Sequence, residues 1–261
     1  MEVHAHSHSH GKKNWKQYFW EFLMLFLAVT LGFFVENQRE HIVERQRATQ
    51  YAKALFEDLE KDTVEIRDVM REDRIILACF DSASSIIHRG IKNYVAPGAF
   101  YYYSNVVASA PSVSWNDATI IQLTQSGNLR YFTNPELVNK ISHYFSQISY
   151  VKLLNANDRG VRDRSMEIRS RVLNNYEYAR FSTYSTDDWL RLPDTLMSKP
   201  FPVQTNDANL LNEFANSFEN RRRVLNLVMK RVYPNAIKEA EKLISLLKEE
   251  YHLSEGTPLE K

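Results

Sequence analysis

Cysteine is almost absent from this sequence of 261 residues, which contains Cys79 alone. A single cysteine excludes a disulfide within the chain and a metal site built from several thiolates. Cys79 lies in the apolar run Ile-Ile-Leu-Ala-Cys-Phe. This setting predicts a small core position rather than a reactive thiol.

Glycine and proline are also scarce, with 7 and 8 residues. So few turn-forming residues argue against a many-stranded β fold and suit long helices. The 33 basic and 32 acidic residues are interspersed and leave a net charge of +1. Because there is no basic excess, we expect no nucleic acid among the partners of this chain.

Motifs that carry catalysis are missing as well. The sequence has no glycine-rich phosphate loop, no HExxH metal motif and no serine nucleophile elbow. The histidines after the N-terminal tail are scattered, which predicts structural or surface positions. We therefore expect a protein that is not an enzyme and that holds no cofactor.

A long apolar run stands near the N-terminus, at residues 15–35 (WKQYFWEFLMLFLAVTLGFFV), and residues 22–35 carry no charge. About 20 helical residues span the ~30 Å hydrocarbon core of a bilayer. Trp15, Tyr18 and Trp20 lie at one edge of the run, where aromatic rings favour the headgroup level. The run therefore predicts a single transmembrane helix over residues 15–35.

Two alternatives to a transmembrane helix stay open. A secretory signal peptide is disfavoured because the run ends in Gly-Phe-Phe-Val-Glu-Asn, without a small-x-small cleavage site. A buried helix of a soluble protein is the other alternative, because the uncharged stretch is short.

The orientation in the membrane is nearly a tie by the positive-inside rule. Three lysines flank the apolar run at its N-terminal side, Lys12, Lys13 and Lys16. Three arginines follow it, Arg39, Arg45 and Arg47. We favour the N-terminus inside, because the lysines lie closer to the run and the N-terminal tail is short. This orientation places the large domain outside the cytoplasm, in the periplasm of a bacterium.

One face of the predicted anchor carries Glu21, Leu25, Ala28 and Gly32 at helical spacing. A carboxylate in a membrane usually faces protein, and a small-xxx-small pair lets two helices approach closely. These residues predict a membrane association face. The alternative is that Glu21 reaches headgroup water and that Ala28 and Gly32 occur by chance.

Beyond the anchor, the pattern predicts a helical soluble domain over residues 36–252, between a disordered His-rich tail at 1–14 and a disordered tail at 253–261. The first helix has no breaker before Gly90, and Asp62 and Asp73 interrupt its apolar stripe. The stripe consists of Ala52, Leu55, Leu59, Asp62, Ile66, Val69, Asp73, Ile76 and Phe80.

Later helices have recognisable ends. We expect one helix from Ser114 to Gly127 or Asn128, and another that opens at Asn134-Pro135 and continues towards Tyr178. The last opens at Asn206-Asp207 and is kinked or restarted at Pro234. Its stripe consists of Leu211, Phe214, Phe218, Arg221, Leu225, Val228 and Val232. Since these stripes must bury one another, the fold class is all-α, an antiparallel bundle of long helices after the anchor.

The segment 91–113 is aromatic and non-periodic, which predicts an irregular loop. Tyr101, Tyr102, Tyr103 and Trp115 are candidates for a ligand pocket or a partner surface. The plainer interpretation, which we favour, is that the loop covers one end of the bundle. The run Arg221-Arg-Arg223 is predicted to be a solvated face rather than a lipid or phosphate contact.

Two stretches resemble a known family. The first stretch comprises residues 15–37 and 51–63, and the second comprises residues 123–130 and 134–145. Both are similar to an uncharacterised single-pass membrane protein family, a domain-of-unknown-function group of Bacteroidetes-type bacteria. The resemblance implies a bacterial membrane protein with an acidic residue at the start of the anchor, which Glu21 matches. It implies no activity.

The N-terminal tail carries His4, His6, His8 and His10 at alternate positions. Such a tract can chelate Zn²⁺, Ni²⁺ or Cu²⁺ weakly, but it lacks the partners that fix ligand geometry. A solvated tail and a cloning remnant are the alternatives. A similar tract in the resembling family disfavours the remnant.

The function predicted from these features is that of a membrane-anchored helical interaction or scaffold protein, with the lipid bilayer and a protein partner or a second copy of the chain as its contacts. The alternative is an extracytoplasmic ligand-binding or sensor domain tethered to the membrane. That alternative predicts a cavity walled by Tyr101–Tyr103 and Trp115.

Overall fold

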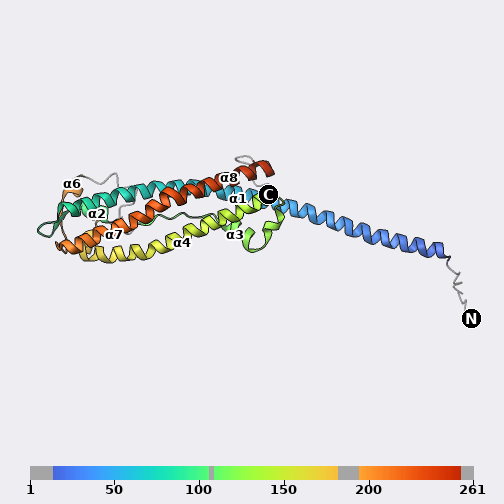
Figure 1. Cartoon of the computed structure of the whole chain (residues 1–261), viewed down its shortest axis with the longest axis horizontal. Coiled ribbons are helices and arrows are strands. Elements are labelled where there is room, and N and C mark those ends of the chain that lie inside the picture. Colours follow the sequence, from blue (N-terminus) through green and yellow to red (C-terminus); the bar gives the residue numbers. More distant parts are fainter. Residues whose placement is uncertain (1–13, 106–108, 182–193, 254–261) are drawn as a thin grey trace, which may run out of the picture. The chain divides into compact units, whose positions relative to one another are not determined.

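The computed structural model describes residues 14–105, 109–181 and 194–253, and the chain divides into two compact units, Met1–Gln50 and Tyr51–Lys261. Helices dominate both units, so the all-α class is confirmed. The elements, labelled in Figure 1 where there is room, are α1 (Trp15–Arg89), β1 (Val95–Pro97), α2 (Gly98–Asn105), α3 (Ala118–Gln125), η2 (Asn128–Tyr131), α4 (Pro135–Val172), α5 (Asn175–Tyr178), α6 (Asp194–Ser198), β2 (Pro200–Pro202), α7 (Ala208–Leu227), η4 (Val228–Val232) and α8 (Tyr233–Tyr251).

The described part of the first unit is the N-terminal portion of α1. Within residues 15–35, fourteen large apolar side chains are exposed, from Trp15 at 84% to Leu27 at 43%. By length and composition, α1 contains a stretch that is apolar enough to cross a membrane, and this stretch is 0% buried. A core helix of a soluble protein passes the same test but would be mostly buried, and a signal sequence passes it as well.

The ends of the helices in the second unit follow the expected local chemistry. Gly90 has φ 88° directly after α1, and Gly127 has φ 72° after α3. Only glycine adopts this left-handed backbone at little cost, so both glycines end their helices as predicted. Asn134 caps α4 by accepting from the amide of Glu136 at 2.9 Å, and Asp207 caps α7 by accepting from Asn209 at 2.9 Å. The α3 helix begins at Ala118 rather than at Ser114.

Three clusters of buried apolar side chains follow one another along the second unit and join α1, α4 and the C-terminal arm, by which we mean the continuous helical segment α7–η4–α8. The first cluster joins residues 52–59 of α1 to 137–148 of α4 and 240–247 of the arm. The second joins residues 66–69 of α1 to Val151 of α4 and 228–236 of the arm. The third joins residues 76–87 of α1 to 168–172 of α4 and 211–225 of the arm.

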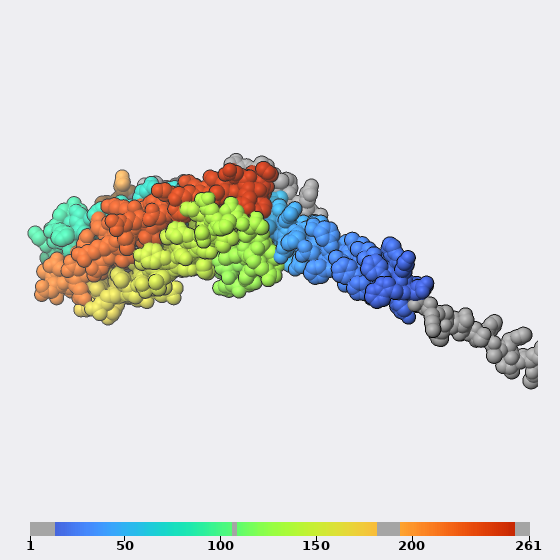
Figure 2. Space-filling view, turned by 45° about the vertical axis from the view of Figure 1, so that its right-hand side comes forward, coloured from blue at the N-terminus to red at the C-terminus, as the bar shows by residue number. Residues whose placement is uncertain are grey.

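These clusters establish the direction of each helix. Residue numbers rise together in α1 and α4 and fall in the C-terminal arm, so α1 and α4 run parallel and the arm runs antiparallel to both. Figure 2 shows the arm lying alongside α4. The helical bundle is as predicted, but its antiparallel pairing holds for the arm alone. The reason is the long connection after α2, which returns the chain to the end of the bundle where α4 begins.

The aromatic segment 91–113 contains more regular structure than predicted. β1 pairs antiparallel with β2, with Ala96 opposite Phe201. α2 follows directly, and a Cβ atom at Gly98 would lie 2.2 Å from the carbonyl oxygen of Leu196. Only glycine permits this approach, because the contact is with backbone that cannot move aside. Three-residue strands with prolines carry no alternating pattern, and the sequence therefore did not reveal them.

The C-terminal arm passes through Pro234 without a break, by way of the π-helical turn η4. Proline in a helix clashes with the carbonyl four residues earlier and removes one hydrogen bond. A π turn widens the backbone where this clash would occur. The predicted disturbance at Pro234 is therefore a local widening, and it lies next to the buried Val228 and Tyr233.

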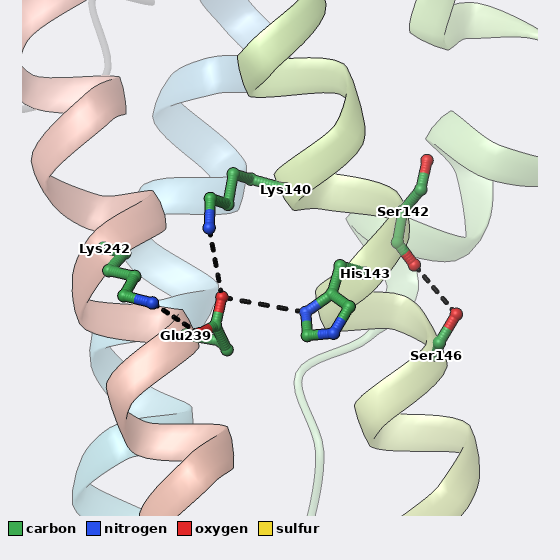
Figure 3. A network of polar contacts seen from close by, with 6 residues as sticks. All are labelled: Lys140, Ser142, His143, Ser146, Glu239 and Lys242. Carbon is green, nitrogen blue, oxygen red and sulfur yellow. Dashed lines mark hydrogen bonds and ion pairs between the residues drawn. The ribbon is translucent and has the colours of Figure 1, made fainter.

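A cluster of charges joins α4 to α8 (Figure 3). Glu239 accepts from Lys242 at 2.7 Å, lies 3.4 Å from the ammonium of Lys140 and faces His143 at 3.7 Å. The hydrogen bond from Lys242, together with Lys140, lowers the pKa of Glu239 below its usual range. His143 is half-exposed, as the sequence predicted for the scattered histidines.

Candidate functional site

A polar cavity of about 350 Å³ lies in the middle of the bundle. It is lined by Asp73 of α1, by one face of α4, by the C-terminal arm and by residues 110–115 of the connection before α3. Its floor consists of Asp73, Asp158, Arg221 and Tyr233. Of these, Asp73, Arg221 and Tyr233 are each 1% exposed. Its size falls within the range of ~300–1,000 Å³ that is typical of small-molecule sites.

Asp73 is the most unusual residue of the floor. Burial raises the pKa of its carboxyl to about 7, against the opposing effect of Arg221. Glu72 and Asp158 raise this pKa further. Its Oδ1 atom is buried, and none of the described residues provides a hydrogen-bond partner for it. Near neutral pH, a modest change in the surroundings would therefore change the charge of Asp73.

Arg221 and Asp158 form the ion pair of the floor. The guanidinium Nη2 of Arg221 lies 3.3 Å from Oδ2 of Asp158 and donates to the carbonyl oxygen of Ser109 at 3.0 Å. The guanidinium carbon also lies 5.5 Å from the ring centroid of Phe80. Burial lowers the pKa of Arg221, and Asp158 opposes this effect. Oδ1 of Asp158 is buried and has no hydrogen-bond partner within the part of the chain that the structure describes.

The fourth wall of the cavity includes Val113 and Trp115, and a second buried carboxylate holds this segment in place. Oδ1 of Asp62 accepts from the backbone amide of Asn116 at 2.8 Å and from its side-chain amide at 3.0 Å. Tyr144 donates to Oδ2 of Asp62 at 3.1 Å. Burial raises the pKa of Asp62, and these hydrogen bonds oppose the rise. Asp62 is thus a satisfied structural carboxylate, unlike Asp73.

The rim of the cavity carries cations from α4, namely Lys152, Arg159 and Arg162. The ammonium of Lys152 pairs with Asp117. No ion pair joins Arg159 or Arg162 to a carboxylate of residues 14–105, 109–181 or 194–253. A positive rim therefore lies above a floor that contains two carboxylates and one guanidinium.

Three buried polar atoms on residues that line this one cavity lack partners among the described residues: Oδ1 of Asp73, Oδ1 of Asp158 and Nε1 of Trp115. Buried polar atoms are normally hydrogen-bonded, so their concentration here sets the cavity apart from an ordinary packing defect. No group of three His, Cys, Asp or Glu side chains that could hold a metal ion occurs in the part of the chain that is described. The arrangement suits an organic molecule with both donors and acceptors.

The structure separates the aromatic residues that the sequence grouped together. Tyr101 and Tyr102 are buried at 0% and 3% exposure in the core between β2 and the bundle, and Tyr103 is half-buried against the same core. Tyr101 donates to the carbonyl oxygen of Pro202 and accepts from the amide of Asn174 at 2.9 Å. Trp115 alone lines the cavity. This cavity is therefore not walled by all four residues, because α2 turns the tyrosines into the core. A pocket or partner surface at these residues stays a prediction.

The other predicted residues have different outcomes. Glu21, Leu25, Ala28 and Gly32 are all exposed along α1, and nothing lies within 4 Å of a Cβ built at Gly32. Whether they form an association face stays a prediction. His4, His6, His8 and His10 lie outside the described residues, as does the tail from residue 254 onwards.

Two further predictions concern single residues in the bundle. Cys79 is buried as predicted, and burial raises the pKa of its thiol to about 12. The solvated face predicted for Arg221–Arg223 is wrong for Arg221, which is 1% exposed. Its place in the apolar stripe of α7 explains this burial.

Sequence reasoning did not identify the cavity, although a signal for it was present. Asp62, Asp73 and Arg221 each interrupt an apolar stripe, and all three are buried at 1% exposure. A charged residue on a buried stripe must find a partner or a ligand. The sequence does not show which residues of different helices lie at the same level of the bundle, so it could not predict that Asp73 and Arg221 meet.

Comparison of the chain with protein-family models, with curated proteins and with solved structures found no match. The resemblance to a single-pass membrane protein family stays a prediction.

Proposed function

We propose that this chain is a membrane-anchored helical protein that acts as an interaction or scaffold module. The observation that carries the proposal is the set of fourteen exposed large apolar side chains in residues 15–35. Transferring such side chains out of water gains ~1.5–3 kcal/mol each, so leaving them all in water would cost on the order of 20 kcal/mol. A lipid bilayer removes this cost without any change in the helix.

The anchor is tested by sedimentation of detergent-free lysate. We expect the full-length chain in the membrane pellet, resistant to carbonate at high pH. The double variant Leu25→Arg, Val29→Arg should move to the supernatant, because each arginine at the centre of the helix costs ~2.5–3.5 kcal/mol. The matched control is Val64→Arg, which changes an exposed residue of the bundle and should stay in the pellet. Wild-type chain in the supernatant would exclude the anchor.

We further propose that the membrane is a bacterial inner membrane and that the bundle lies in the periplasm. The family resemblance and the three lysines at the N-terminal side of the anchor support this assignment. A periplasm-dependent reporter fused at the C-terminus is therefore expected to be active. A fusion active only in the cytoplasm would reverse the orientation.

The interaction itself is assigned to the face that carries Glu21 and Gly32, where a second copy or another membrane helix can approach closely. Gly32→Leu is expected to weaken association in mild detergent, because a leucine holds the two backbones apart. Glu21→Gln should weaken it too, if the carboxylate pairs across the interface. The measurement is sedimentation equilibrium, with Phe33→Leu as a control for changes off this face. Unchanged oligomeric state in both variants would exclude the association face.

A second candidate function, a ligand-binding or sensor domain tethered to the membrane, is favoured by the cavity. Three of its lining residues carry buried polar atoms without hydrogen-bond partners in the described part of the chain, and its volume suits a small organic molecule. This function is compatible with the anchor, since the bundle alone would bind the ligand.

A further inference from the structure

The floor of the cavity contains two buried acceptor oxygens that receive no hydrogen bond from the described residues. Oδ1 of Asp73 and Oδ1 of Asp158 accept from none of the described residues, and Asp73 is only 1% exposed. A buried polar atom without a partner costs ~1–3 kcal/mol, and more when it is charged. Two such oxygens on residues that line one cavity are explained if a bound molecule donates hydrogen bonds at the floor.

The rim, in contrast, carries cations that are not paired with carboxylates of the described residues. Two of the four cations around the cavity, Lys152 and Arg221, are paired with carboxylates of the protein. Arg159 and Arg162 have no such carboxylate in the described residues. The cations of the rim would repel an occupant that carried only a positive charge. The carboxylates of the floor would repel an occupant that carried only a negative charge.

We infer that the cavity binds a small zwitterion of the amino-acid type, with its ammonium at the floor beside Asp73 and its carboxylate at the rim beside Arg159 and Arg162. An ammonium group donates three hydrogen bonds, which suits two acceptor oxygens at the floor. Arginine forks bind carboxylates with two parallel hydrogen bonds, which suits the rim. This inference rests on the second candidate function and names the ligand class of the same cavity.

The remaining wall indicates the side chain of the ligand. Val113, Val224, Leu225 and Val228 line the cavity beside the indole of Trp115. This surface is branched and aliphatic, and it would cover an apolar side chain that leaves the ammonium and carboxylate free. L-Leucine is therefore the probe of choice.

Charge coupling gives the proposal a second, independent readout. Asp73 interacts electrostatically with Glu72 on its own helix, Asp158 of α4, Arg221 of α7 and Tyr233 of α8. Burial raises the pKa of Asp73 to about 7, so below this pH a bound ammonium must displace a proton. Affinity for L-leucine is expected to be about 10-fold higher at pH 8 than at pH 6, since proton release is coupled to binding.

The test is isothermal titration calorimetry of the full-length chain in detergent micelles at pH 8. L-Leucine is compared with 4-methylpentanoate, which lacks the ammonium, and with 3-methylbutylamine, which lacks the carboxylate. We expect L-leucine to bind and each truncated probe to bind at least 10-fold more weakly. Asp73→Asn and Arg162→Ala should each reduce the affinity for L-leucine by at least 10-fold.

The control variant is Asp163→Asn, an exposed change on α4 outside the cavity, and its affinity should equal that of the wild type. Arg162→Ala changes a partly exposed rim residue, so it tests the proposal even if Asp73→Asn fails to fold. Equal binding of either truncated probe, abolished by Asp73→Asn, would overturn the zwitterion and leave the ligand-binding function standing. No binding by L-leucine, by the other amino acids or by the truncated probes at millimolar concentration would overturn both.

Discussion

The free energy of unfolding of Asp73→Asn, relative to that of the wild type, is expected to increase as the pH rises from 4 to 8. Burial raises the pKa of Asp73 from its ordinary value of 3.8 to about 7 in the folded chain. Between these two values the folded chain holds a proton that the unfolded chain has released. The stability contributed by neutral Asp73 is therefore complete below pH 4 and is lost as the pH rises through 7. Asparagine carries no charge at any pH, so the variant avoids this loss.

The size of the effect follows from the shift in pKa. A shift of one pKa unit corresponds to ~1.4 kcal/mol, so the gain of the variant between pH 4 and pH 8 is on the order of 4 kcal/mol. The measurement is urea unfolding of the full-length chain in micelles at pH 4, 6 and 8, compared as differences between variant and wild type. A pH-independent difference for Asp73→Asn would mean that the carboxyl is not desolvated in the folded chain.

The expected destabilisation by charged Asp73 bears on function. A domain that only needed to hold its helices together would be more stable with a neutral residue at position 73. Sites that bind ligands commonly carry such a cost, because the groups that bind are arranged for the complex rather than for the free protein. A ligand ammonium beside Asp73 would remove the same penalty that asparagine removes.

The parts of the fold that sequence reasoning predicted well are those fixed by local chemistry. Asn134, Asp207, Gly90 and Gly127 each act within one helical turn, so their side chains or backbone angles suffice to place a helix end. The apolar stripes of α1 and α7 were also correct, because burial repeats with the period of the helix.

The parts that were missed depend on residues distant in sequence. Ala96 and Phe201 meet in a short sheet that neither strand specifies alone. The parallel direction of α1 and α4 depends on a long connection, and no periodicity records the path of a connection. The cavity needs Asp73, Asp158 and Arg221 at one level of the bundle, and this level depends on how three helices are aligned lengthwise.

Asp62→Ala is expected to destabilise the chain by about 3–5 kcal/mol. Asp62 accepts three hydrogen bonds, two from Asn116 and one from Tyr144, and it is 1% exposed. Hydrogen bonds to a charged group contribute about 1.5–3 kcal/mol each, and their loss leaves buried donors without partners. The desolvation of Asp62, which raises its pKa, offsets part of this loss. The free energy of unfolding is again measured with urea on the full-length chain.

Tyr144→Phe is the matched comparison, because it removes one of the three hydrogen bonds and keeps the ring in the core. It should cost about 1–2 kcal/mol. Hydrogen exchange of residues 109–117 separates the two variants further: the amide of Asn116 loses its acceptor in Asp62→Ala and keeps it in Tyr144→Phe. Equal exchange in the two variants would mean that Asp62 does not hold this segment. Trp115 adjoins Asn116 and lines the cavity. Faster exchange in Asp62→Ala should therefore be accompanied by weaker ligand binding. Such a result would show that Asp62, which holds the segment, supports the ligand site that contains Asp73.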